Sequence, residues 1–105
     1  MTLCKFNTLT TKQIEHCKGI LETKGSEYVF GPDRLEHFKT AATAQGVTPK
    51  QALWAMVAKH IASLSSMCRV EGDYPLALWQ EKITDTLCYS LLLWALVNEE
   101  AEVNV

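Results

Sequence analysis

The chain has 105 residues, of which 48% are hydrophobic, and its 10 basic and 12 acidic residues give a net charge of −2. A chain of this length suits one domain with a small core, so we expect a single helical domain that forms a homo-oligomer. The nearly balanced charge argues against binding to nucleic-acid polymers or membrane surfaces, because both need a basic field. A net charge near zero is still compatible with a local basic site that binds a small anion.

The four cysteines form no C-x-x-C pair and match no zinc module. Cys17 and Cys88 fall within apolar helical patterns, where a reduced thiol acts as a small hydrophobic group. The N-terminus lacks the apolar segment of a signal peptide, and the most apolar run, Leu91–Val97, is shorter than the roughly 20 residues of a membrane span. We therefore expect a cytoplasmic protein.

Residues 1–10 are predicted to be a short lead-in, followed by a first helix over about 11–24. Thr10 and Gln13 have the spacing of a capping box, and Gly25 is a natural helix end. The stripe predicted to face inward consists of Ile14, Cys17, Ile20 and Leu21.

A second helix is predicted from about 32–33 to Gly46, and a third, central helix over Thr48–Met67. Thr48 and Gln51 form a second capping-box pattern. The central helix is apolar on much of its circumference, which predicts packing between neighbouring helices.

The fourth helix is predicted over about 75–97, and a break near Leu78 would make it a short turn followed by a long helix. Residues 98–105 are predicted to be a flexible tail. The main apolar stripe of the fourth helix consists of Trp79, Ile83, Leu87, Leu91 and Trp94. Further leucines make it apolar on other sides, which indicates burial in a bundle or a subunit contact. No segment alternates as a strand does. The sequence therefore predicts an all-α, single-domain four-helix bundle.

Basic and aromatic side chains cluster near the predicted helix ends and on the central helix. A charge of this kind is most often a solvated surface group, and a histidine on an apolar helix is most often a hydrogen-bonded core residue. Together they suit a phosphate-bearing ligand, and Arg34 is the best candidate for a bidentate phosphate contact. The predicted ligand-binding residues are Lys24, Tyr28, Arg34, His37, Lys39, Lys59 and His60.

Glu81 and Asp85 lie one helical turn apart and project from one face of the fourth helix. Two carboxylates, together with water and phosphate oxygens, are ligands that magnesium prefers. The simpler interpretation is a solvated acidic face beside Lys82.

Three stretches of the chain resemble small phage and prophage proteins, which are grouped with the MazG-like all-α nucleotide pyrophosphatases and with nucleotide-modification-associated domains. The similarity extends over residues 14–97, and the stretches are KGSEYVFGPDRLEHFKTAA, GVTPKQALWAMVAKHIASL and LWQEKITDTLCYSLLLWAL.

In the MazG-like enzymes, acidic residues on two helices hold magnesium, which holds the triphosphate. The resemblance implies that Glu81 and Asp85 stand for one acidic pair, although their spacing is E-x-x-x-D instead of E-x-x-D. The other pair is missing, since Lys59 and His60 stand where acids are expected. Glu27, or Glu22 on the first helix, replaces that pair only in part. The departure weakens the prediction of hydrolysis more than that of nucleotide binding.

Three functions follow as hypotheses. The first is a phage-type protein of the bacterial cytoplasm that sequesters a small nucleotide, such as a cyclic nucleotide signal of antiviral defence, and needs no cofactor. The second is a magnesium-dependent nucleoside-triphosphate pyrophosphohydrolase. The third is a helical interaction protein without a small ligand, in which the three tryptophans serve only the core or an interface. The incomplete acidic set favours the first.

Overall fold

The computed structural model describes residues 1–28, 31–69 and 72–103, and the side chains of Tyr28 and Val103 lie outside that description. Within these ranges the chain forms no strand and four helices: α1 (Leu3–Tyr28), α2 (Glu36–Gln45), α3 (Pro49–Arg69) and α4 (Leu76–Val103). The predicted all-α fold is confirmed.

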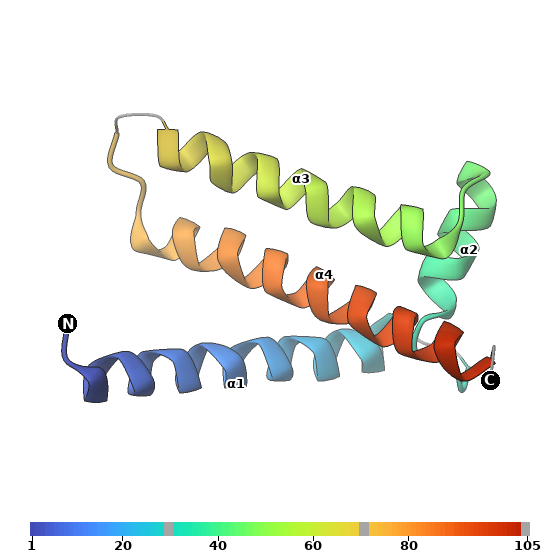
Figure 1. Ribbon diagram of the computed structural model, residues 1–105, viewed down its shortest axis with the longest axis horizontal. Coiled ribbons are helices and arrows are strands. Elements are labelled where there is room, and N and C mark those ends of the chain that lie inside the picture. The colour runs from blue at the N-terminus through green and yellow to red at the C-terminus, as the bar shows by residue number, and fades with distance from the viewer. Residues whose placement is uncertain (29–30, 70–71, 104–105) are drawn as a thin grey trace.

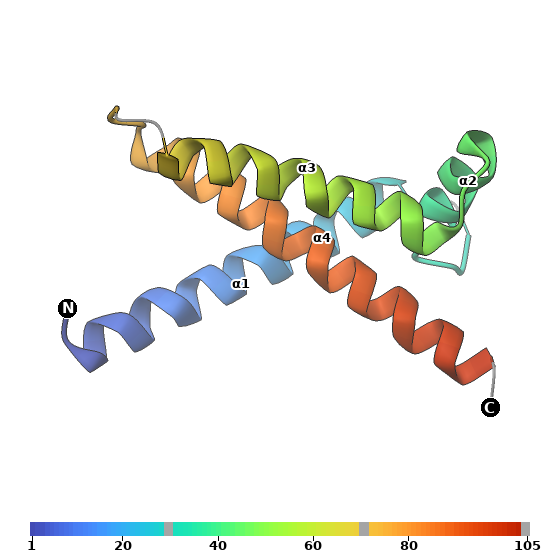
Figure 2. The same cartoon turned by 45° about the horizontal axis from the view of Figure 1, so that its top comes forward.

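Helix α4 lies between the other two long helices (Figure 1). It contacts α3 on one side, as an antiparallel hairpin, and α1 on the other. The short α2 packs against α3 near the C-terminal end of α4. In Figure 2, α1 crosses α4, and its N-terminal half diverges from the rest of the molecule.

The hydrophobic core lies where α2, α3 and α4 meet. Leu35, Leu53 and Leu96 form its buried cluster, and Leu53 and Leu96 are 0% and 1% exposed. Phe38 and Tyr89 pack against this cluster with their rings partly buried. The core therefore fixes the end of the molecule at which α2 approaches α4.

Two helix ends follow the sequence signals. At the start of α3, the backbone N–H of Gln51 donates to Thr48 Oγ1 at 3.2 Å, and the backbone N–H of Thr48 donates to Gln51 Oε1 at 2.9 Å. This is the predicted capping box. Helix α2 ends at Gly46, whose positive φ of 70° suits glycine, and the N–H of Val47 donates to Ala42 O.

Helix α1 differs from the prediction at both ends. It begins at Leu3, so the predicted lead-in is helical, and Thr10 does not cap it. The Thr10 hydroxyl instead donates to the carbonyl of Phe6 in the preceding turn, and Gln13 Nε2 donates to Thr84 Oγ1 of α4 at 2.8 Å. The helix also continues through Gly25, which was wrongly predicted to end it.

Helix α4 is continuous through Leu78, so the alternative of a short turn followed by a long helix does not hold. The helix extends to Val103, so residues 98–103, predicted to belong to a flexible tail, are helical. The added turns are held by side chains. Asn98 Nδ2 donates to Trp94 O at 2.8 Å, and Lys50 Nζ lies 3.0 Å from Glu100 Oε2.

The stripe predicted to be the inner face of α4 is largely exposed, with Ile83 and Leu87 at 40%, Leu91 at 47% and Trp94 at 64%. The buried residues of α4 are Thr84, Cys88 and Leu96. Because Gln13 satisfies the Thr84 hydroxyl, a polar residue can occupy the covered face. Within α1, Ile14 was also predicted to face inward and is 67% exposed.

In the described ranges, no helix combines the length and apolar character needed to cross a membrane.

Candidate functional site

A cavity of about 410 Å³ lies between the C-terminal half of α1, the start of α2 and the middle of α4. Its volume is within the range of small-molecule sites. Its lining residues are Ile20, Leu21, Lys24, Arg34, His37, Phe38, Asp85, Cys88, Tyr89 and Leu92. Three of the seven predicted ligand-binding residues, Lys24, Arg34 and His37, therefore share one cavity.

Arg34 is held against α1. Its Nη2 donates to the carbonyl of Leu21 at 3.2 Å. The side chain passes so close to Gly25 that a Cβ atom there would lie 2.7 Å from Arg34 Nε. A glycine within α1 therefore makes room for the guanidinium, whose hydrogen bond to Leu21 uses one of five N–H donors.

Two further basic groups line the same cavity. Lys24 comes from the next turn of α1, and His37 from the first turn of α2. The amides and dipole at the start of a helix also favour anions. One wall of the cavity therefore carries basic side chains from α1, from α2 and from the segment that joins them.

The opposite wall carries an acid and aromatic rings. Asp85 and Tyr89 lie one turn apart on α4, and the Tyr89 ring meets Phe38 edge-on, with centroids 6.5 Å apart. Tyr89 also stacks on His60, with ring centroids 5.2 Å apart and an interplanar angle of 18°. The ring of Tyr89 is thus fixed between α2 and α3.

His60 supports this wall and is not among the residues that line the cavity. It is 8% exposed, and its Nδ1 lies 4.0 Å from Asp85 Oδ2, too far for a hydrogen bond. Among the described residues this buried Nδ1 has no hydrogen-bond partner. The structure therefore places His60 behind Asp85 and Tyr89.

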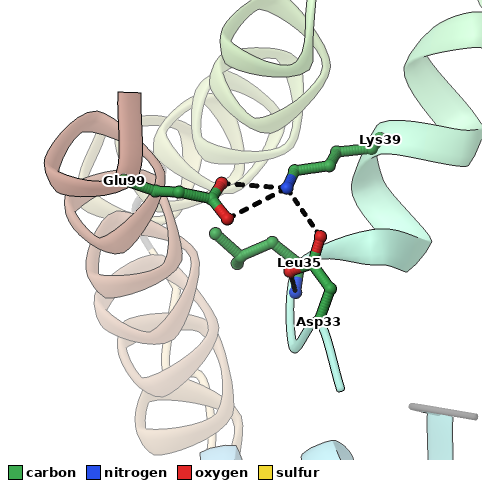
Figure 3. A network of polar contacts seen from close by, with 4 residues as sticks. All are labelled: Asp33, Leu35, Lys39 and Glu99. Atoms are coloured by element: carbon green, nitrogen blue, oxygen red, sulfur yellow. Dashed lines mark hydrogen bonds and ion pairs between the residues drawn. The ribbon is translucent and has the colours of Figure 1, made fainter. Parts of the chain in front are cut away.

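Lys39 takes part in a separate ion-pair network (Figure 3). Its Nζ lies 2.6 Å from Asp33 Oδ2 and 2.9 Å from Glu99 Oε2, which joins α2 to the last turns of α4. The hydrogen bond from Lys39, followed by that from the Leu35 N–H, holds the pKa of Asp33 below its usual value. The hydrogen bond that Lys39 donates to Asp33 and, to a smaller extent, the one that it donates to Glu99 raise the pKa of Lys39.

Lys59, another predicted ligand-binding residue, does not line the cavity. It is exposed on α3, and the side chain of Tyr28 lies outside the described residues.

The predicted acidic pair lies together on α4. Asp85 lines the main cavity, and it also lines a smaller cavity of about 210 Å³ with Glu81 and His16. Glu27 is exposed near the end of α1 and lines neither cavity. Over residues 1–28, 31–69 and 72–103, no three His, Cys, Asp or Glu side chains are grouped to hold a metal ion.

The sequence prediction missed Tyr89, although it follows Asp85 by four residues and so shares its helix face. Cys88 also lines the cavity. Burial, reinforced by the neighbouring Cys17, raises the pKa of Cys88 to about 12. The thiol therefore stays protonated at neutral pH and contributes to the apolar part of the cavity lining.

Comparisons of the chain with protein-family models, with curated proteins and with solved structures gave no match.

Proposed function

We propose that the chain binds a small phosphate-bearing nucleotide in the main cavity and sequesters it without turnover. The observation that carries the proposal is the convergence of Lys24, Arg34 and His37 opposite the ring of Tyr89. A guanidinium can hold a phosphate through two parallel hydrogen bonds. An aromatic ring offers a surface on which a base can stack.

The remaining lining suits the neutral parts of a nucleotide. Asp85 accepts hydrogen bonds, so it complements a ribose hydroxyl or an exocyclic amino group. Ile20, Leu21 and Leu92 provide apolar surface beside the aromatic rings. The resemblance to small phage proteins makes a cyclic nucleotide signal of antiviral defence the first ligand to test.

Magnesium-dependent pyrophosphohydrolysis of a nucleoside triphosphate is the second candidate. It is favoured by Asp85, which lines the main cavity and shares the smaller one with Glu81. Two carboxylates of this kind can bind a magnesium ion that also takes phosphate oxygens and water. In this case Glu81→Gln or Asp85→Asn would abolish turnover.

Native mass spectrometry of protein purified from cells, before and after denaturation, tests the first proposal. A released nucleotide would support sequestration. Calorimetric titration with nucleoside triphosphates and with cyclic nucleotides, in the presence and absence of EDTA, then separates the two candidates. Binding that survives EDTA without turnover fits sequestration, whereas magnesium-dependent turnover fits the hydrolase.

A pair of variants locates the site. Arg34→Lys keeps the charge but removes the fork of donors, so it should weaken binding. Lys59→Ala removes an exposed cation on α3 that does not line the cavity, so it should bind as the unmodified chain does. Normal binding by Arg34→Lys would refute the assigned site. Failure to bind or turn over any nucleotide would leave the interaction protein as the remaining hypothesis.

A further inference from the structure

The inner face of α1 continues beyond the helix that covers it. Cys17 packs against α4 and is 2% exposed, whereas Ile14, one turn earlier, is 67% exposed. Phe6 and Leu3 follow at helical spacing on the same side, with exposures of 52% and 75%. These residues are exposed because the N-terminal half of α1 extends away from α4, as Figure 2 shows. We call residues 3–14 the α1 arm.

Helix α4 has a second apolar surface of its own. Ile83, Leu87, Leu91 and Trp94 recur at spacings of three and four residues, so they lie on one side of the helix, away from the buried Thr84, Cys88 and Leu96. Each of the four is at least 40% exposed. We call these four residues the outer stripe of α4.

The accessible surface and the radius of gyration of the chain are both larger than those of a compact monomer of its mass. It exposes 7733 Å², whereas a folded monomer of 11.8 kDa is expected to expose about 5,900 Å². Its radius of gyration is 16.0 Å, against about 13 Å for a compact domain of this length. The excess of about 1,800 Å² per chain, if buried in a pair, falls within the range of stable homodimer interfaces.

We propose that a second copy of this chain covers both surfaces, with the α1 arm of each protomer packed on the outer stripe of α4 of the other. A two-fold dimer requires both halves of such a contact on one chain, and this chain carries both. The proposal does not depend on a bound nucleotide.

Charge supports the pairing of these two segments. The α1 arm contains Lys5 and Lys12 and no acidic residue. Helix α4 contains five acidic residues and one lysine; Glu99 and Glu100 are ion-paired within the chain, and the remaining net charge of the helix is still negative. Opposite net charges on the two segments favour their mutual association over the pairing of like with like.

Sedimentation equilibrium of the full chain at micromolar concentration tests the proposal. We expect twice the mass of 11.8 kDa. Because an unpaired carboxylate buried in the interface is costly, Phe6→Glu and Leu87→Glu should each raise the dimer dissociation constant about 100-fold or more. Trp54→Lys is the matched control, because Trp54 is 55% exposed on α3, which packs on the other side of α4 from α1.

Circular dichroism checks that each variant remains helical, and two sites are tested so that one misfolded variant does not decide the outcome. A photo-crosslinking benzoylphenylalanine in place of Phe6, in a mixture of ¹⁵N-labelled and unlabelled chains, should join the arm of one chain to the α4 peptide of the other. A monomeric unmodified chain would overturn the proposal. So would crosslinks to α3, or a dimer disrupted by Trp54→Lys and not by Leu87→Glu.

Discussion

Gly25 occupies the point on α1 where Arg34 crosses the helix, so Gly25→Ala perturbs the cavity without removing a charge. The new Cβ would lie 2.7 Å from Arg34 Nε and 3.2 Å from its Cδ. Contacts this short are not tolerated, and the flexible arginine side chain is the part that moves. The guanidinium should therefore leave both Leu21 O and its place in the cavity wall.

The effects on stability nearly cancel. Alanine is favoured over glycine within a helix by about 0.5–1 kcal/mol. The partly exposed hydrogen bond from Arg34 to Leu21 contributes about 1 kcal/mol, which the variant loses. The free energy of unfolding should therefore change by less than about 1 kcal/mol, which corresponds to a shift in Tm below roughly 4–8 °C.

The effect on ligand binding should be much larger. A hydrogen bond from a charged group is worth about 1.5–3 kcal/mol, so losing one such contact to phosphate weakens binding roughly 10- to 150-fold. Gly19→Ala is the matched control on the same helix, because a Cβ at Gly19 meets nothing within 4 Å. It should raise Tm and leave the dissociation constant unchanged.

Thermal unfolding gives the stability of both variants, and calorimetric titration with the nucleotide released from the purified protein gives their affinities. If Gly25→Ala binds that nucleotide as tightly as Gly19→Ala does, Arg34 does not contact the ligand from its observed position. The assignment of the cavity as the binding site would then be refuted.

Three further predictions concern stability and reactivity. Thr48→Ala removes the capping hydroxyl of α3 and should lower the free energy of unfolding by about 1 kcal/mol in urea titrations; an unchanged midpoint would contradict the capping role. Because the pKa of Asp33 is lowered from 3.8 in the folded chain, its pairing with Lys39 stabilises the fold above that pH and is lost as pH falls through the lowered value. Thermal melts at decreasing pH should therefore show a smaller acid-induced loss in Lys39→Met than in the unmodified chain, and identical profiles would exclude the pair as the cause. With a pKa of about 12, Cys88 should react with iodoacetamide at neutral pH far more slowly than the exposed Cys4, and peptide mass spectrometry showing equal rates would contradict its burial.

Two identical motifs show how far local sequence determines this fold. Thr48 and Gln51 form the predicted capping box, whereas Thr10 and Gln13 have the same spacing and lie inside α1. A threonine hydroxyl can cap a helix or donate to the carbonyl of the preceding turn, as Thr10 does to Phe6. The choice depends on whether helix-forming residues precede it, and the motif alone does not contain that information.

The apolar pattern of α4 predicted a helix but not the side that its own chain covers. Leu87 and Leu91 lie in the most regular stripe and are exposed, whereas Thr84 on the covered side is 3% exposed. An apolar stripe on a helix indicates which residues are buried, but it does not indicate whether the same chain or another molecule buries them.

The candidate site was predicted in part because basic residues near helix ends are visible in sequence, whereas their ion-pair partners are not. Arg34 and Lys39 were both predicted to bind the ligand. Lys39 is instead bound to Glu99, which lies 60 residues further along the chain. Arg34 reaches the cavity because Gly25 leaves room for it, which is a tertiary contact between α1 and the start of α2.

The central position of α4 also sets the order in which this chain can fold during synthesis. The ribosome makes α1, α2 and α3 before the helix on which α1 and α3 pack. Residue Leu53 of α3 is fully buried in a cluster that needs Leu96, near the C-terminal end of α4. Translation at roughly 5–20 residues per second takes about 1.5–6 s to produce the 28 residues of α4. During those seconds the faces of α1 and α3 that α4 later covers are exposed to water, so the risk of aggregation is greatest before α4 has been made.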